Sequence, residues 1–175
     1  MIMIKPEVER MKIMKTIAIC VALVAVPALA ADTPSFVVVG AAGESRTLGV
    51  ADLQKLIVRE VSVTDPHSKQ ASRYRGVALS AVLSLVGVPS GEALRGKVLA
   101  SMVQVEALDG YRVVFSLAEL DAEVGSTDAV VAFELDGKPL GGELGAFRMV
   151  VPTDKRSVRW VRQVARIKVI QPSAP

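Results

Sequence analysis

Three basic side chains and the only tryptophan of the sequence stand close together near the C-terminus. Lys155, Arg156 and Arg159 follow Pro152, and Trp160 comes directly after Arg159. Cationic side chains on a turn beside backbone N–H donors suit a phosphate group. A tryptophan ring can either stack on a ligand or anchor an edge of the core. The segment is therefore a candidate anion site.

The same basic side chains have a second interpretation. Residues 31–143 hold 10 basic and 15 acidic side chains, whereas residues 144–175 hold 7 basic and 1 acidic. The basic turn could neutralise the acidic part of the chain through exposed ion pairs, each of which contributes little. If the segment were helical, Lys155, Arg159, Arg162 and Arg166 would share one solvated face. Both interpretations remain open at this point.

Arg75 is a further basic candidate, because Arg75 and Gly76 open the segment that leads into a predicted helix. The Arg75 side chain could reach an anion at the start of that helix, or only close the end of a strand. Gly76 is expected to allow a close approach or a backbone conformation that other residues do not.

The sequence offers one cysteine, Cys20, and one histidine, His67. Residues 31–175 therefore contain no thiolate nucleophile, no disulfide and no cysteine-based zinc site. A Ser-His-Asp arrangement would have to use His67 as its base. His67 lies in the sequence Asp-Pro-His-Ser, which favours an exposed turn over a metal ligand. We predict no catalytic residue and no metal ligand.

The first thirty residues have the pattern of a secretory signal peptide. Lys12 and Lys15 precede an apolar run over 17–26, and Ala28-Leu29-Ala30 supplies the small residues of a cleavage site. The run is shorter than the roughly 20 residues that a membrane-spanning helix needs. We expect cleavage after Ala30, a periplasmic or secreted location, no transmembrane segment afterwards and a single domain over 31–175.

The pattern of apolar residues predicts an α+β domain with mostly antiparallel strands and about three short helices. The predicted strands are 35–39, 58–64, 71–75, 98–107, 111–115, 130–135, 147–151 and 164–170. The predicted helices are 50–57, 79–86 and 116–122. The residues expected in the core are Met102, Leu108, Phe115 and Leu117.

Turn residues support this order of strands and helices. Asp109-Gly110 is a favoured pair for a tight hairpin, to which we also assign Tyr111. Ser116 and Glu119 have the spacing of a capping box, so a helical turn is expected to begin at Ser116.

Three segments, in this order and spacing, resemble the molybdopterin-binding domain of the sulfite-oxidase family of molybdenum oxidoreductases. They are YRGVALSAVLSLVGV (74–88), DGYRVVFSLAEL (109–120) and DGKPLGGELGAFRMVVPTDKRSVRWVRQVARIKV (136–169). The third segment is the most specific, because a glycine loop, an apolar strand ending in proline, a basic turn and a tryptophan occur there together. The resemblance implies a strand-rich α+β fold and molybdopterin as a ligand.

The resemblance also implies what is missing. In the family enzymes, a cysteine upstream of the segment matching 74–88 binds molybdenum beside the two sulfurs of the pterin, and the metal passes oxygen atoms to or from a substrate. Residues 31–73 contain no cysteine. The resemblance therefore implies no cysteine-ligated molybdenum, and a fold does not carry its chemistry when the ligand is absent. The candidate cofactor contacts are Arg75, Lys155, Arg156, Arg159 and Trp160.

Three functions of different class are compatible with the sequence. The first is a non-catalytic exported module of this fold that binds a pterin-like or other anionic small molecule. The second is a molybdenum-cofactor-dependent oxidoreductase, or a subunit of one, with an atypical metal ligand. The third is a protein that binds an envelope enzyme or sensor. Nucleic acid is not an expected partner, because residues 31–175 carry a net charge of only +1 and are expected to be exported.

Overall fold

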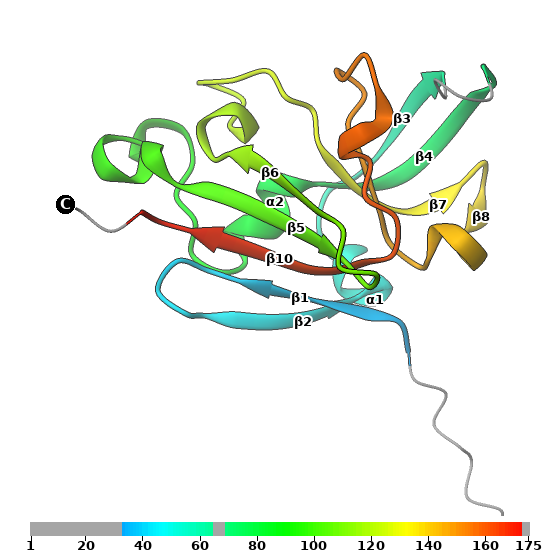
Figure 1. Ribbon diagram of the computed structural model, residues 1–175, viewed down its shortest axis with the longest axis horizontal. Coiled ribbons are helices and arrows are strands. Elements are labelled where there is room, and N and C mark those ends of the chain that lie inside the picture. The colour runs from blue at the N-terminus through cyan, green and yellow to red at the C-terminus, as the bar shows by residue number, and fades with distance from the viewer. Residues whose placement is uncertain (1–32, 65–68, 173–175) are drawn as a thin grey trace, which may run out of the picture. The chain divides into compact units, whose positions relative to one another are not determined.

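Two five-stranded sheets form the body of the protein (Figure 1). The computed structural model describes residues 33–64 and 69–172. Within these ranges no helix is long and apolar enough to cross a membrane. The predicted signal peptide, Cys20 and His67 lie outside the described residues.

The first sheet, which we call sheet A, joins strands from both ends of the described chain. Its strands, in spatial order, are β2 (Ser45–Gly49), β1 (Ser35–Val39), β10 (Val164–Ile170), β5 (Met102–Ala107) and β6 (Arg112–Ser116). The pair β1 and β10 is parallel, and the other pairs are antiparallel. The N-terminal strand is thus held by the last strand of the fold.

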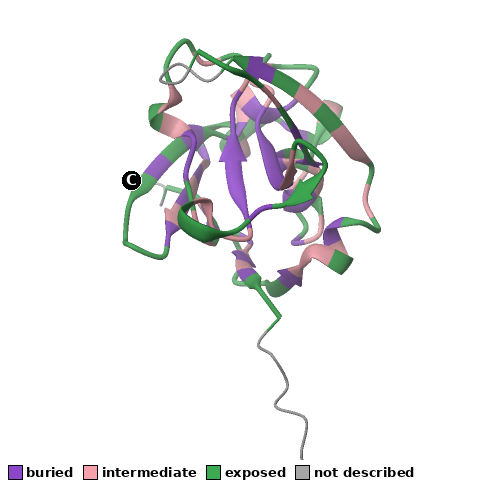
Figure 2. Cartoon of the chain, turned by 90° about the vertical axis from the view of Figure 1, so that its right-hand side faces the viewer, coloured by how far each residue is buried: buried purple, intermediate pink, exposed green. Residues whose placement is uncertain are grey.

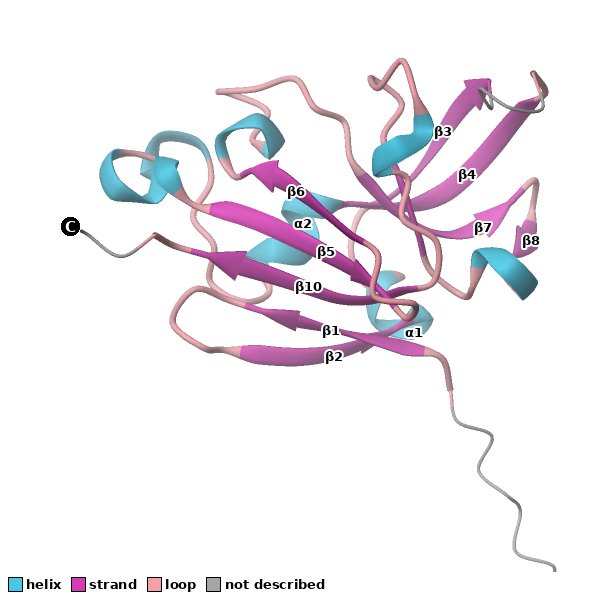
Figure 3. Cartoon of the chain, viewed as in Figure 1, coloured by secondary structure: helices cyan, strands magenta, loops and turns pink. Residues whose placement is uncertain are grey.

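The second sheet, sheet B, is antiparallel throughout. Its strands are β3 (Val58–Thr64), β4 (Ala71–Ala78), β7 (Val130–Leu135) and β8 (Lys138–Pro139), and β9 (Arg148–Val150) pairs with β7. Helical segments are short, as Figure 3 shows. They are α1 (Val50–Leu53), α2 (Leu79–Ser84) and the single turns η1 (Gly91–Ala93), η2 (Gly96–Ala100), η3 (Ala118–Leu120), η4 (Gly142–Leu144) and η5 (Ser157–Arg159).

One hydrophobic core takes side chains from both sheets. Figure 2 colours the buried residues of the chain purple. Phe36 and Ile167 contribute from sheet A, and Tyr74, Phe133 and Met149 from sheet B. The ring centroids of Phe36 and Phe147 are 4.8 Å apart in an edge-to-face arrangement. Burial of each such side chain contributes roughly 1.5–3 kcal/mol. The described residues all belong to one compact unit, Asp32–Pro175.

The expected fold class is confirmed, and four strands have the predicted bounds. These are β1, β3, β7 and β10. The tight hairpin at Asp109-Gly110 is also confirmed, since Gly110 has a φ of 84° and its N–H donates to the Ala107 carbonyl at 3.1 Å. Glu119 accepts the Ser116 N–H at 2.7 Å, as the capping box predicts.

Several local predictions are wrong. Residues 98–100 form the end of η2 instead of a strand, because Ser101 donates its N–H to the Val98 carbonyl and closes a turn. The helix predicted over 50–57 ends at Leu53, and Ile57 is 87% exposed, so no apolar stripe continues. Leu108 is 75% exposed instead of buried, because it stands at the tip of the hairpin between β5 and β6.

The helical alternative for the basic segment is also wrong. Residues 155–166 contain only the turn η5 before β10 begins. Lys155, Arg159, Arg162 and Arg166 therefore do not share a helix face. Two strands, β2 and β8, were not expected from the sequence.

Candidate functional site

A cleft of about 500 Å³ lies where the β5–β6 hairpin, η4, β9 and η5 meet. Its walls carry three charged side chains, Arg148, Arg162 and Asp109. The remaining lining residues are Ala107, Tyr111, Leu144, Ser157, Val158 and Trp160. Two positive charges and one negative charge give this surface a net positive character.

Arg148 is the buried cation of the cleft. It belongs to β9, where its Cα is opposite that of Ala132 in β7, and the residue is 8% exposed. The guanidinium carbon lies 5.3 Å from the centroid of the Tyr74 ring and 5.4 Å from that of the Trp160 ring. Nη1 donates a hydrogen bond to the Tyr74 hydroxyl. These contacts fix the guanidinium in place at the wall of the cleft.

Trp160 is the second aromatic residue in contact with the Arg148 guanidinium. The residue is 5% exposed, and its indole N–H donates to the Val151 carbonyl at 3.0 Å. Its ring meets that of Tyr74 edge to face, with 6.3 Å between centroids. Cation–π contacts of a desolvated arginine are worth roughly 2 kcal/mol. Trp160 therefore both anchors the core and holds the cleft cation.

The loops around the cleft are tied together at Gln163. This residue has a φ of 51°, which is unusual for a residue other than glycine. Its N–H donates to the Leu144 carbonyl at 2.8 Å, and its carbonyl accepts the Leu108 N–H at 3.0 Å. At Gly145, with a φ of 72°, an added Cβ would lie 2.7 Å from the Gln163 Cα. Glycine is therefore required at position 145. Its close packing against Gln163 holds the segment that carries Arg162, the residue before Gln163, at the cleft.

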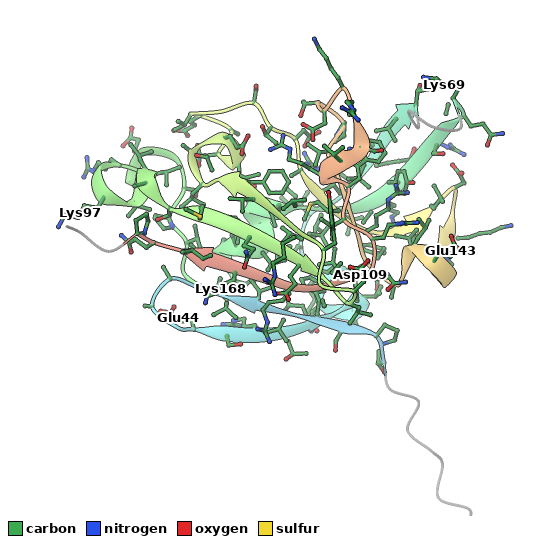
Figure 4. The ribbon with its side chains drawn as sticks, viewed as in Figure 1. Glu44, Lys69, Lys97, Asp109, Glu143 and Lys168 are labelled. Atoms are coloured by element: carbon green, nitrogen blue, oxygen red, sulfur yellow. The ribbon has the colours of Figure 1, made fainter. Side chains whose placement is uncertain are left out.

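Tyr111 links the hairpin to the basic turn. Its hydroxyl donates to the Val158 carbonyl at 2.6 Å, and its own N–H is accepted by the Asp109 carboxylate at 2.9 Å. Tyr111 and Val158 remain about half exposed at the cleft. Figure 4 shows Asp109 near the ends of β5 and β10. The hairpin residues thus form one wall of the cleft in addition to their role in the turn.

Arg159, one of the predicted anion contacts, is engaged by carboxylates of the protein. Its Nε and Nη2 donate to the two oxygens of Asp154 at 2.8 and 2.5 Å, and Nη1 lies 3.4 Å from Glu119. The guanidinium also lies 4.5 Å from the Phe115 ring centroid. The Asp154 hydrogen bond raises the pKa of Arg159, against a lowering by desolvation. This arginine fastens the basic turn to η3.

The other predicted contacts lie apart from the cleft. Lys155 and Arg156 are exposed on the turn before η5 and do not line it. Arg75 donates from Nη1 to both oxygens of Glu134, at 3.0 and 3.1 Å, across the β4–β7 pair of sheet B. Only Trp160 of the five predicted contacts is a cleft residue.

Gly76 has the close approach that the sequence suggested. An added Cβ would lie 2.3 Å from the Val131 carbonyl oxygen and 2.6 Å from the Ala132 Cα. The register of β4 and β7 shifts at this position. The prediction for Gly76 is confirmed, and its role is in the sheet.

The residue patterns of the sequence did not single out Arg148, Arg162 or Asp109 as site residues. One signal for Arg148 was present, since it is a lone charge between Phe147 and Met149 in an apolar strand. A charge in such a strand is buried only when other groups hold it. For Arg162 and Asp109 the sequence contains no comparable signal, because both are ordinary turn or loop charges.

The described residues offer cationic donor groups at the cleft. Within 33–64 and 69–172, no group of three or more His, Cys, Asp or Glu side chains could hold a metal ion. The same ranges contain no cysteine. The fixed guanidinium of Arg148 and the nearby Arg162 fit the phosphate end of a pterin cofactor.

The fold has two packed sheets, and residues 136–169 line much of its cationic cleft. Both features fit a domain of the molybdopterin-binding type. The sequence matches the family described as "Oxidoreductase molybdopterin binding domain" over residues 23–175, and the chain belongs to that family. The resemblance to sulfite-oxidase-type domains is thereby confirmed. A search of curated proteins found no match.

A solved structure shows the same fold. The sulfane dehydrogenase SoxCD from Paracoccus pantotrophus is similar with a TM-score of 0.60 and 18% sequence identity. The similarity covers 79% of this chain and 38% of that chain. The present chain therefore spans well under half of the SoxCD chain that it matches.

Proposed function

We propose that this protein is an exported, non-catalytic binding module that holds a phosphate-bearing pterin in the cleft around Arg148. The observation that carries the proposal is the buried guanidinium of Arg148, fixed between the Tyr74 and Trp160 rings at a cleft of about 500 Å³. A cation fixed in a partly dry site interacts more strongly with an anion than an exposed cation does. Membership of the molybdopterin-binding family supports a pterin as the ligand.

Different cleft residues would contact different parts of the ligand. Arg148 and Arg162 would bind the phosphate, since charge-assisted hydrogen bonds contribute roughly 1.5–3 kcal/mol each. Tyr111 supplies an apolar ring face beside them. The Asp109 carboxylate accepts hydrogen bonds, which suits the N–H groups of a pterin ring. The cleft thus offers two cations, a carboxylate acceptor and an aromatic ring.

The missing thiolate supports a binding role over catalysis. Bound molybdopterin supplies two sulfurs to a molybdenum centre that exchanges oxygen atoms, and family enzymes complete the ligand set with a cysteine. The only cysteine of this sequence, Cys20, lies in the predicted signal peptide. Hydroxyl and carbonyl oxygens are harder ligands with different metal preferences. The alternative, an oxidoreductase or subunit with an atypical ligand, requires a donor of another kind.

The test is purification of the full chain from its own host, followed by pterin and metal analysis. We expect a pterin in the wild-type protein, a reduced amount in Arg148→Lys and less in Arg148→Gln. Lysine keeps the charge but loses the planar fork that grips two oxygens. Arg75→Gln is the matched control, because Arg75 is paired with Glu134 away from the cleft.

Two results would overturn the proposal. The absence of pterin from the wild-type protein, combined with no binding of added pterin phosphate, would exclude the ligand. Stoichiometric molybdenum with oxygen-atom transfer would establish the oxidoreductase alternative. Thermal unfolding of each variant separates loss of the ligand from loss of the fold.

A further inference from the structure

One face of sheet A, the side away from the core, carries an ordered set of side chains, and we call it the open face. Side chains alternate between the two faces of a strand, so partners in register form rows across the sheet. One row contains Val37, Arg166, Glu106 and Arg112. The next row contains Val39, Lys168, Gln104 and Val114.

The open face is not packed against the rest of the described chain. In β10, the inward side chains of Ile167 and Val169 are buried, whereas Arg166 and Lys168 are exposed. The same alternation occurs in β6, where Phe115 is buried and Val114 is 46% exposed. In Figure 1 no helix crosses in front of β1, β2, β5 and β10.

The charge of the open face is positive and incompletely compensated. Glu106 is its one acidic side chain, and it already accepts a hydrogen bond from Arg112 at 2.9 Å. Among the described residues, Arg166 and Lys168 form no ion pair. Figure 4 shows Lys168 on the central strand of the sheet. Arg166 and Lys168, on the same face of a central strand, are therefore available to carboxylates of another molecule.

Apolar side chains flank these cations on both sides. Val37 and Val39 of β1 are half-buried, as is Met102 of β5, and Ile170 lies at the end of β10. Val114 stands at the β6 edge. Protein interfaces combine apolar side chains with polar and charged ones, and this face offers both.

We propose that the open face docks an acidic protein, whose carboxylates meet Arg166 and Lys168 while its apolar side chains cover Val37, Val39 and Val114. A second copy of this chain fits less well, because the face carries three cations, Arg112, Arg166 and Lys168, and one carboxylate, so two copies would bring net positive charge against net positive charge. A membrane surface fits less well, since the face carries no aromatic residue of the kind that anchors proteins at lipid interfaces. This inference concerns a surface separate from the Arg148 cleft.

The experiment places the photo-crosslinker benzoylphenylalanine at Val114 in the full chain, expressed in its own host. Val124, which is 54% exposed and lies outside sheet A, is the control position. We expect a protein adduct from position 114 and none of the same mass from position 124. Arg166→Glu with Lys168→Glu should reduce the adduct about tenfold or more, because like charges across an interface are strongly unfavourable. Lys155→Glu with Arg156→Glu makes the same charge change elsewhere and should leave it intact.

The proposal requires more than an adduct. The crosslinked region of the partner must be acidic, and changing its carboxylates to lysine must restore the adduct with the Arg166→Glu, Lys168→Glu variant. A missing adduct at position 114, a second copy of this chain, a lipid adduct, or an adduct that is insensitive to charge reversal would overturn the proposal. Pterin binding should be unchanged in the reversed variant, so this inference can fail independently of the proposed function.

Discussion

Arg148 and Arg159 show how surroundings give two arginines of one segment opposite roles. Arg159 meets Asp154 and Glu119, so its charge is used inside the protein. Arg148 lies against two aromatic rings and a hydroxyl, and it lines the cleft. Position at the cleft, and not charge alone, separates the roles of the two residues.

The first prediction follows from the contacts of Arg159. Arg159→Ala should lower the free energy of unfolding by about 1.5–3 kcal/mol, because it removes hydrogen bonds between charged groups. Arg156→Ala, on the same turn but exposed, should change it by less than about 0.5 kcal/mol. Urea denaturation of both variants tests the difference, and equal stabilities would contradict a structural role for Arg159.

Residue types predicted part of this site. The sequence drew attention to the basic turn and to Trp160, which does line the cleft. It did not distinguish Arg159 from Lys155 and Arg156, because only Arg159 contacts Glu119 and Phe115, which come from a distant part of the chain. Arg148 was missed because residues 147–151 were interpreted only as a strand, and its contact with Tyr74 comes from a distant part of the chain.

At the scale of single elements, strands rich in β-branched residues were predicted well. Ser35–Val39 and Val164–Ile170 have clear patterns, and both were placed correctly. β2, with the sequence SRTLG, contains a single apolar side chain that is buried, Leu48. Its strand conformation depends on pairing with β1, and local sequence carries little of that information.

The second prediction concerns the close approach at Gly76. Gly76→Ala should destabilise the protein by roughly 3 kcal/mol, because the added methyl group would overlap the β7 backbone. At Gly110 an added Cβ meets nothing within 4 Å, and only its φ of 84° is unfavourable. Gly110→Ala should therefore cost about 1–2 kcal/mol. Thermal and urea unfolding give the order of the two, and a reversed order would refute the packing argument.

The third prediction concerns Asp121, which ties two loops together. Its carboxylate accepts the Gly91 N–H at 2.8 Å and the Glu123 N–H at 2.9 Å, and these bonds lower its pKa. A lowered pKa adds stability above the unfolded-state value of about 3.9, and this stability is lost as the pH falls through the folded-state value.

Asp121→Asn should therefore be less stable than the wild-type protein at pH 7. The difference should shrink as the pH falls below the unfolded-state value of about 3.9 and through the lower folded-state value, at which the wild-type carboxyl becomes protonated. Unfolding measured from pH 7 to pH 2 tests this. A difference that does not depend on pH would contradict the role of the ionised carboxylate.

At the scale of the whole molecule, the basic side chains of residues 144–175 are divided between different surfaces. Of its seven basic side chains, Arg148 and Arg162 line the cleft, and Arg166 and Lys168 lie on the open face. The sequence predicted the charge asymmetry and the fold class. It did not predict this division, which depends on the alternation of side chains in β9 and β10.

The fourth prediction concerns processing of the chain. We propose that residues 1–30 are removed on export, because a basic start, a short apolar run and Ala-Leu-Ala follow one another there. The intact mass of protein recovered from the exported fraction should correspond to a chain that begins at Ala31. Retention of Cys20 in that protein would contradict the proposal.

The most direct test of the central claim is a calorimetric titration of a pterin phosphate into purified protein. We predict binding by the wild-type protein and by Arg75→Gln, with an affinity that falls as salt screens the charges. Arg148→Gln, still folded by its thermal transition, should bind about 10- to 100-fold more weakly, the equivalent of one lost charge-assisted contact. No heat of binding by the wild-type protein at low salt, or equal affinity of Arg148→Gln, would contradict the assignment of the cleft.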